Sequence, residues 1–171
     1  MSHPFRIRLP ALPSQAVLRS TGVYISGGLF ATAFYTFLDA SIFSRVANGS
    51  SNVHITILDW LPLICSILGM LIINFIDKTH LSNDDSFSYS GGSGVMLKAK
   101  IVLFMGFALM AGGLAGSLAV LVLKYLVPGH PWPTLWLGVA GAVANGLVMA
   151  SSSVLWVSQM GEGEYRYDLS L

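Results

Sequence analysis

The sequence predicts an all-α integral membrane protein whose four transmembrane helices form a compact bundle. Of the 171 residues, 54% are hydrophobic and only 10% are charged, whereas an ordinary soluble domain carries about 25% charged residues. Four stretches of the chain contain almost no charged residues. The length of each is close to the roughly 20 residues that a helix needs to cross a bilayer. Little of the chain therefore remains for a separate soluble domain.

The four spans follow in order from these apolar stretches. They are residues 20–44, 57–76, 101–123 and 135–159. A basic segment, 1–19, precedes the first span, and a tail, 160–171, follows the fourth. Between the last two spans, the run Pro128-Gly129-His130-Pro131-Trp132-Pro133 ends one helix and forces a turn. These two spans are therefore expected to form an antiparallel hairpin.

The segment between the second and third spans, 77–100, is expected to be a flexible polar loop. Its serine, glycine and aspartate residues cannot bury enough apolar surface to order the chain. Ser82, with Asp85 three residues later, fits an acidophilic kinase site, but a plain linker is the preferred interpretation. Asn48 begins a glycosylation acceptor pattern, Asn48-Gly49-Ser50. Its position close to the end of the first span, and so to the bilayer, argues against modification.

The nine lysine and arginine residues predict the orientation in the membrane. With four spans, both termini and the loop 77–100 lie on one side. Seven basic residues fall in these segments: Arg6, Arg8, Arg19, Lys78, Lys98, Lys100 and Arg166. Only Arg45 and Lys124 fall on the other side. Because basic residues concentrate on the cytosolic side of membrane proteins, both termini are predicted to be cytosolic.

The residue types needed for catalysis are scarce in the predicted spans. Apart from Asp59 at the headgroup level, the spans contain one carboxylate, Asp39, and no histidine. No histidine pair has metal-ligand spacing, and the single cysteine, Cys65, excludes an internal disulfide. The sequence contains no phosphate-binding glycine loop, and its net charge of +1 does not indicate nucleic-acid binding. The sequence predicts no enzyme, no catalytic, metal or cofactor-binding residues, and no nucleic-acid partner.

Small residues recur at helical spacing in three of the four spans. Such residues let helix backbones approach closely, so that dispersion forces and weak hydrogen bonds hold membrane helices together. The predicted helix-packing residues are Gly22, Ser26, Ala108, Gly112, Gly116, Gly138, Ala142 and Gly146. These faces either pack the helices of one chain together or bind a protein partner, and the sequence leaves both interpretations open.

Three polar side chains within the spans need partners. Asp39, in the third of the first span farthest from the cytosol, is expected either to pair with Lys124 or to be protonated. Asn74 and Asn145 are able to hydrogen-bond across helices, for about 0.6–2 kcal/mol each. A proton or ion relay would need several ionisable groups at successive depths. Structural roles are therefore the preferred interpretation.

Motifs in the spans and before the third span carry a family resemblance. They are Leu38-Asp39-Ala40, Ser88-Tyr89-Ser90-Gly91-Gly92, Lys98-Ala99-Lys100-Ile101, Gly112-Gly113-Leu114-Ala115-Gly116-Ser117 and Asn145. This set resembles the transmembrane protein 50 family. Asp59-Trp60-Leu61-Pro62 and Cys65-Ser66-Ile67-Leu68-Gly69-Met70 are similar to its fungal, vacuolar protein sorting branch. The likeness runs from about Gly22 to Gln159.

The resemblance implies a non-enzymatic protein of endosomal and vacuolar membranes that acts in traffic from late endosomes to the vacuole. It also implies a hetero-oligomer with another small four-span protein, of the vacuolar protein sorting-associated protein 55 family. It assigns no catalytic or ligand residues. From the residues alone, two other classes stay open. One is a small transporter or channel, or an accessory subunit of one, which needs a hydrated polar path. The other is a lipid-binding subunit, which needs an open cleft between helices.

Overall fold

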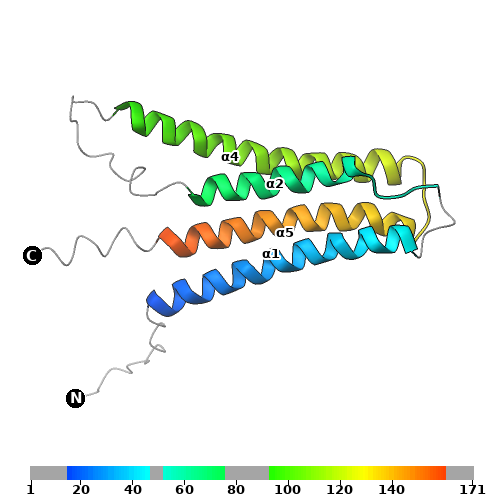
Figure 1. Ribbon diagram of the computed structural model, residues 1–171, viewed down its shortest axis with the longest axis horizontal. Helices are drawn as coiled ribbons and strands as arrows, with labels where there is room; N and C mark the ends of the chain where they lie inside the picture. Colours follow the sequence, from blue (N-terminus) through cyan, green and yellow to red (C-terminus); the bar gives the residue numbers. More distant parts are fainter. Residues whose placement is uncertain (1–14, 47–51, 76–92, 161–171) are drawn as a thin grey trace, which may run out of the picture.

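The computed structural model describes residues 15–46, 52–75 and 93–160, which form long helices in an up-and-down order (Figure 1). The elements are α1 (Gln15–Val46), α2 (Ile57–Phe75), α4 (Ser93–Val120) with its continuation, the π-helix η1 (Leu121–Leu126), and α5 (Thr134–Met160). Within these ranges, four helices are long and apolar enough to cross a membrane. The all-helical fold and the four apolar helices agree with the prediction from sequence.

The helices extend beyond the predicted spans. α1 begins at Gln15, five residues before the predicted start, and ends at Val46. α4 begins at Ser93, so residues 93–100 of the predicted loop form the first turns of a helix. Lysine and alanine, which are frequent there, are good helix formers that need no apolar surroundings. Ser82, Asn48 and most of the predicted tails and loop lie outside the described residues.

The helices are arranged as two pairs. α1 packs along α5, α2 packs along α4, and α5 joins the pairs by contacting α2 and α4. Figure 1 shows the resulting order α4, α2, α5, α1. Of the most apolar stretch of α5, 44% is buried, against 22% in each of the other three helices. α5 is therefore the central helix, whereas α1 and α4 lie at the edges.

The bundle has two different ends. The end formed by residues 52–56 and 127–133 is here called the loop end, and the end at which α1 and α4 begin is called the open end. At the open end, the first turns of α4 extend beyond the end of α2 (Figure 1). α1 stays close to α5 there, since a Cβ atom on Gly22 would lie 2.5 Å from Ser158 Cβ. Contacts between helices therefore reach from the loop end to near the open end, where Asn74 of α2 also bonds to Ser152 of α5.

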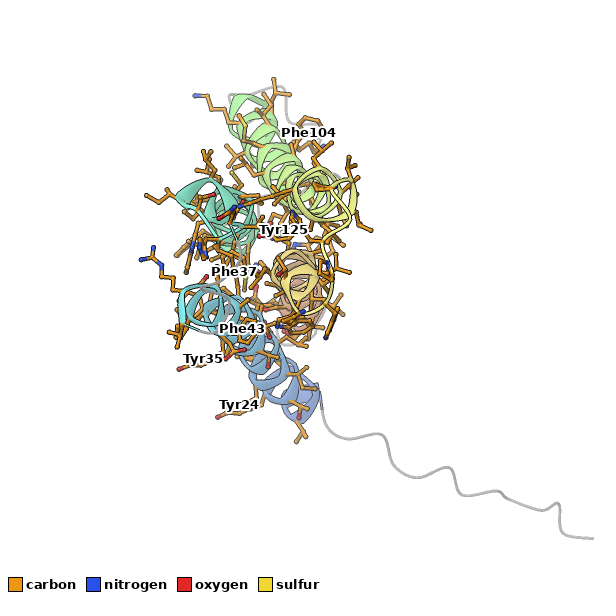
Figure 2. The ribbon with its side chains drawn as sticks, turned by 90° about the vertical axis from the view of Figure 1, so that its right-hand side faces the viewer. Tyr24, Tyr35, Phe37, Phe43, Phe104 and Tyr125 are labelled. Atoms are coloured by element: carbon orange, nitrogen blue, oxygen red, sulfur yellow. The ribbon has the colours of Figure 1, made fainter. Side chains whose placement is uncertain are left out.

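The hydrophobic core lies where α1, α2, η1 and α5 meet. Its buried members are Ala33, Phe37, Ala40, Ile55, Leu63, Tyr125, Leu137, Ala140, Ala144 and Val148. The ring of Phe37 meets that of Trp60 edge to face, with 4.9 Å between centroids. Figure 2 shows Phe37 and Tyr125 between the helices, and Tyr24 and Tyr35 on the outer side of α1. Within the core, α1 therefore contacts the other helices through the inner side of α1.

A π-helical turn and a glycine turn connect α4 to α5. The Val127 N–H donates to the Val122 carbonyl oxygen at 2.8 Å, the five-residue spacing of a π-helix. This turn carries the helix to Leu126, three residues beyond the predicted end. Gly129 then adopts a φ of +69°, which favours glycine. The two helices run antiparallel, as the proline-rich segment predicts.

Candidate helix-contact site

Buried polar side chains join α2 to α5 at the centre of the bundle. The Ser66 hydroxyl donates to Asn145 Oδ1 at 2.6 Å, and Asn145 Nδ2 donates to the Gly141 carbonyl oxygen at 2.9 Å. Ser66 and Asn145 are both almost completely buried. A buried amide without partners costs about 1–3 kcal/mol. Ser66 therefore orients Asn145, and the pair sets how α2 and α5 meet.

Two further polar contacts involve α5. The Ser26 hydroxyl lies 3.0 Å from the Ser151 carbonyl oxygen, and the Ser151 hydroxyl lies 2.9 Å from the Ser26 carbonyl oxygen, which joins α1 to α5. Asn74 Nδ2 on α2 donates to the Met70 carbonyl oxygen at 2.8 Å and to Ser152 Oγ at 3.3 Å. Within the described part of the chain, Asn74 Oδ1 is buried without a hydrogen-bond partner. Asn74 and Asn145 thus both bond across helices.

Glycines allow the closest approach between α2 and α4. A Cβ atom on Gly69 would lie 2.6 Å from the Gly106 carbonyl oxygen and 2.8 Å from the Met110 nitrogen. A Cβ atom on Gly113 would overlap the Ser66 hydroxyl oxygen. The first two neighbours are backbone atoms, which cannot turn aside as a flexible side chain can. α2 and α4 pack at their observed separation because these positions lack a side chain.

Several predicted packing residues lie between helices. A Cβ atom on Gly22 would lie 2.5 Å from Ser158 Cβ, and one on Gly138 would lie 2.6 Å from Tyr125 Cδ2. A Cβ atom on Gly116 would lie 3.5 Å from Pro62 Cγ, an ordinary van der Waals distance. Ala142 is half-buried, and a Cβ atom on Gly146 would meet nothing within 4 Å. The contacts at Gly22 and Gly138 are therefore the tight ones in this set.

Two of the three residues in the predicted ridge of α4 do not pack within the described chain, and only Gly116 lies against α2. Ala108 and Gly112 are exposed, and a Cβ atom on Gly112 would meet nothing within 4 Å. The buried ridge consists of Gly106, Met110, Gly113 and Ser117. One residue turns a helix by about 100°, so Gly113 faces α2 and Gly112 does not. Both ridges have helical spacing in the sequence, and spacing alone does not select between them.

An ion pair that was not predicted from the sequence joins α2 to η1 at the loop end. Asp59, the third residue of α2, accepts a hydrogen bond from the Thr56 N–H at 2.8 Å, as in a capping box. Lys124 Nζ lies 2.5 Å from the same carboxylate oxygen and donates to the His54 carbonyl oxygen at 2.9 Å. The Asp59 side chain is only 8% exposed. The spacing Thr56-x-x-Asp59 was the available signal for the capping part of this cluster.

Asp39 does not pair with Lys124, contrary to one of the two expectations. Lys124 lies on η1 and is paired with Asp59. Asp39 lies on the exposed side of α1, and α1 and α4 are at opposite edges of the bundle (Figure 1). The sequence predicts a similar depth in the membrane for Asp39 and Lys124, but the helices that lie between them keep them apart.

The described residues form contacts between helices, and their reactive side chains do not gather in one cluster. Among residues 15–46, 52–75 and 93–160, no group of three or more His, Cys, Asp or Glu side chains is placed to hold a metal ion. Cys65 is a half-buried free thiol. The described contacts bind one helix to another through small and polar residues.

Fold and contacts together define an all-α protein. Its described part contains four helices that are each long and apolar enough to cross a membrane and that are held together by small and polar residues. The chain belongs to the Uncharacterised protein family (UPF0220), whose family model matches residues 1–165.

The chain is similar to named proteins of three organisms over most of its length. It is 45% identical over 167 residues to UPF0220 protein C8D2.02c of Schizosaccharomyces pombe, covering 98% of this chain and 95% of that one. It is 44% identical over 178 residues to vacuolar protein sorting-associated protein 68 of Saccharomyces cerevisiae, covering 98% and 94%. It is 27% identical over 135 residues to a transmembrane protein 50 homolog of Dictyostelium discoideum, covering 77% and 84%. The family resemblance inferred from the motifs is confirmed. No solved structure matches the chain.

Proposed function

We propose that this protein is an integral membrane subunit that acts in sorting proteins to the vacuole. The observation that carries the proposal is the 44% identity, over 98% of the chain, to a protein named for vacuolar protein sorting. Because the match covers nearly the whole of both chains, it supports a shared fold and a shared cellular task. The resemblance also supports a place in endosomal and vacuolar membranes, on the route from late endosomes.

The four helices cross the bilayer in this proposal, with the loop end on the lumenal side. Lys98 and Lys100 near the start of α4, together with Arg19 of α1, lie at the open end, and Lys124 and Arg45 lie at the loop end. Three of the five basic residues within the described ranges thus lie at the open end, which supports its assignment to the cytosol.

The molecular activity we propose is assembly with another small four-span membrane protein, of the vacuolar protein sorting-associated protein 55 family. The interhelical hydrogen bonds of Ser66, Asn145 and Ser151 hold the chain's own helices together. The edge helices keep large apolar side chains exposed, with Tyr24 of α1 at 79% and Phe104 of α4 at 75%. Within a bilayer, such open faces are covered by lipid or by a partner helix.

The function is tested by expressing this chain in S. cerevisiae cells that lack vacuolar protein sorting-associated protein 68. We expect the chain to restore delivery of a fluorescent late-endosomal cargo to the vacuole towards the level of cells that contain that protein. The same cells, solubilised in mild detergent, should yield the chain with a stoichiometric small membrane protein. Stable expression in the correct membranes without any gain in cargo delivery would contradict the proposal.

The orientation is tested by protease protection. In sealed vesicles of known orientation, protease added to the cytosolic side should cut between α2 and α4, because the proposed topology leaves residues 76–92 on that side. Cleavage is followed with a tag on the C-terminus, and vesicles opened with detergent serve as the control. Cleavage of this segment only by lumenal protease would show that the orientation is inverted.

A further inference from the structure

Asp39, on the outer side of α1, is a carboxylate without a partner among the described residues. Asp39 is exposed, and none of the described residues forms a hydrogen bond or ion pair with its side chain. Two other polar residues within the helices, Asp59 and Asn145, differ from it. Asp59 is buried and paired with Lys124, and Asn145 is bonded to Ser66.

Asp39 lies within the apolar length of α1 and not at its end. Tyr35, one turn earlier, is 66% exposed, whereas Ile42 and Val46, one and two turns later, are 56% and 78% exposed. Val46 lies seven residues beyond Asp39, which is about 10 Å along a helix. Aspartate has a single methylene group, so it cannot extend its charge to the headgroups as lysine and arginine do. In the proposed membrane setting, its carboxylate stays among apolar groups.

The neighbouring part of α1 does not donate to this carboxylate. The hydroxyls of Thr32 and Thr36 bond to carbonyl oxygens of their own helix, at 2.8 and 2.7 Å. The backbone N–H groups in the middle of a helix are already bonded within it. An unpaired charge within the hydrocarbon part of a bilayer is costly, although less so toward its edge than at its centre. A donor from outside the described chain would remove most of this cost.

We propose that the outer face of α1, defined by Tyr24, Tyr35, Asp39 and Ile42, binds a transmembrane helix of a different protein. A lysine or arginine of that helix, in the lumenal third of the membrane, pairs with Asp39. The inference rests on the proposed function, since it names the surface through which the subunit assembles. Figure 2 shows Tyr24 and Tyr35 pointing away from the bundle on this side.

Charge complementarity selects a different protein over a second copy of this chain. In two copies with the same orientation, packing α1 against α1 through this face sets Asp39 beside Asp39, and the like charges repel. Lys124 is already paired with Asp59. Arg45 lies six residues beyond Asp39, about 9 Å nearer the helix end. A partner helix that carries a basic residue at the depth of Asp39 supplies the missing charge.

The surface is tested by photo-crosslinking of the full-length protein in native membranes. Tyr35 is replaced with p-benzoylphenylalanine, and the same replacement of Phe104, exposed on the opposite edge helix, is the matched control. We expect Tyr35 to crosslink to a transmembrane segment of a second protein at least about tenfold more than Phe104 does. Asp39→Lys should lower the amount of copurified partner at least about tenfold. Changing the basic residue of the crosslinked segment to aspartate should then restore binding to Asp39→Lys.

Asp39→Asn separates the charge from the fold, because it keeps the shape and the hydrogen-bonding capacity. If Asp39→Lys does not accumulate, a several-fold loss of partner in a folded Asp39→Asn variant supports the proposal, and unchanged binding in that variant overturns it. Full partner binding by Asp39→Lys overturns it, as does a Tyr35 crosslink to a second copy or to lipid alone. If a stoichiometric partner crosslinks only from Phe104, this surface is wrong and the proposed function stands. If the wild-type chain is purified without any membrane partner, both this surface and the proposed assembly are contradicted.

Discussion

Gly113→Leu should abolish the folded protein, whereas Gly112→Leu at the adjacent position should leave it intact. A Cβ atom on Gly113 would lie 2.5 Å from the Pro62 carbonyl oxygen and 3.0 Å from the Ser66 nitrogen, both backbone atoms of α2. A leucine there forces α2 and α4 apart. Overpacking costs about 1–3 kcal/mol and occasionally more, and we expect a value at or above the upper end because backbone atoms are displaced.

The measurement is size-exclusion chromatography of fluorescently tagged variants in mild detergent, combined with thermal unfolding. We expect the monodisperse peak to be lost for Gly113→Leu and retained for Gly112→Leu, whose Cβ meets nothing within 4 Å. Gly113→Ala should fall between the two, since it adds the overlapping Cβ atom alone. Equal peak heights and equal Tm values for the two leucine variants would show that α2 does not pack on Gly113.

Lys124→Leu should destabilise the protein by about 3 kcal/mol, because it leaves the Asp59 carboxylate without its cation. The Asp59 side chain is 8% exposed and that of Lys124 is 29% exposed, so water reaches the carboxylate poorly. The Thr56 N–H and hydroxyl still donate to Asp59 after the change, at 2.8 and 3.1 Å. Because these donors remain, we expect the loss of stability to lie near the lower end of the range for breaking a buried ion pair. The readout is the Tm in mild detergent.

The double variant Asp59→Asn with Lys124→Leu isolates the ion pair. Removing both charges leaves no buried unpaired ion, so we expect it to recover most of the stability that Lys124→Leu loses. Arg45→Leu, at an exposed position on the same end of the bundle, is the control for loss of a positive charge. A double variant less stable than Lys124→Leu would show that Asp59 acts through the capping box more than through the pair.

Local composition alone determined the number, order and approximate length of the helices. The charge-free stretch 101–123 lies within the continuous helix formed by α4 and η1, and the turn after it contains Gly129, whose positive φ only glycine adopts readily. These features depend on neighbouring residues in one chain, so the sequence reports them directly. The motif set also sufficed to identify the family, since the motifs extend over most of the chain.

Only the tertiary structure decided which side of each helix faces its neighbours. In a soluble helix, polar residues mark the side that faces water, but the outer side of these helices is as apolar as the inner side. The hydrophobic pattern therefore carries almost no information about rotation around the helix axis. This is why the sequence did not distinguish Gly112 from Gly113, or predict that Lys124 pairs with Asp59 and leaves Asp39 on the outer side of α1. Helix rotation is set by backbone approach at glycines and by hydrogen bonds between distant segments, which exist only once the chain has folded.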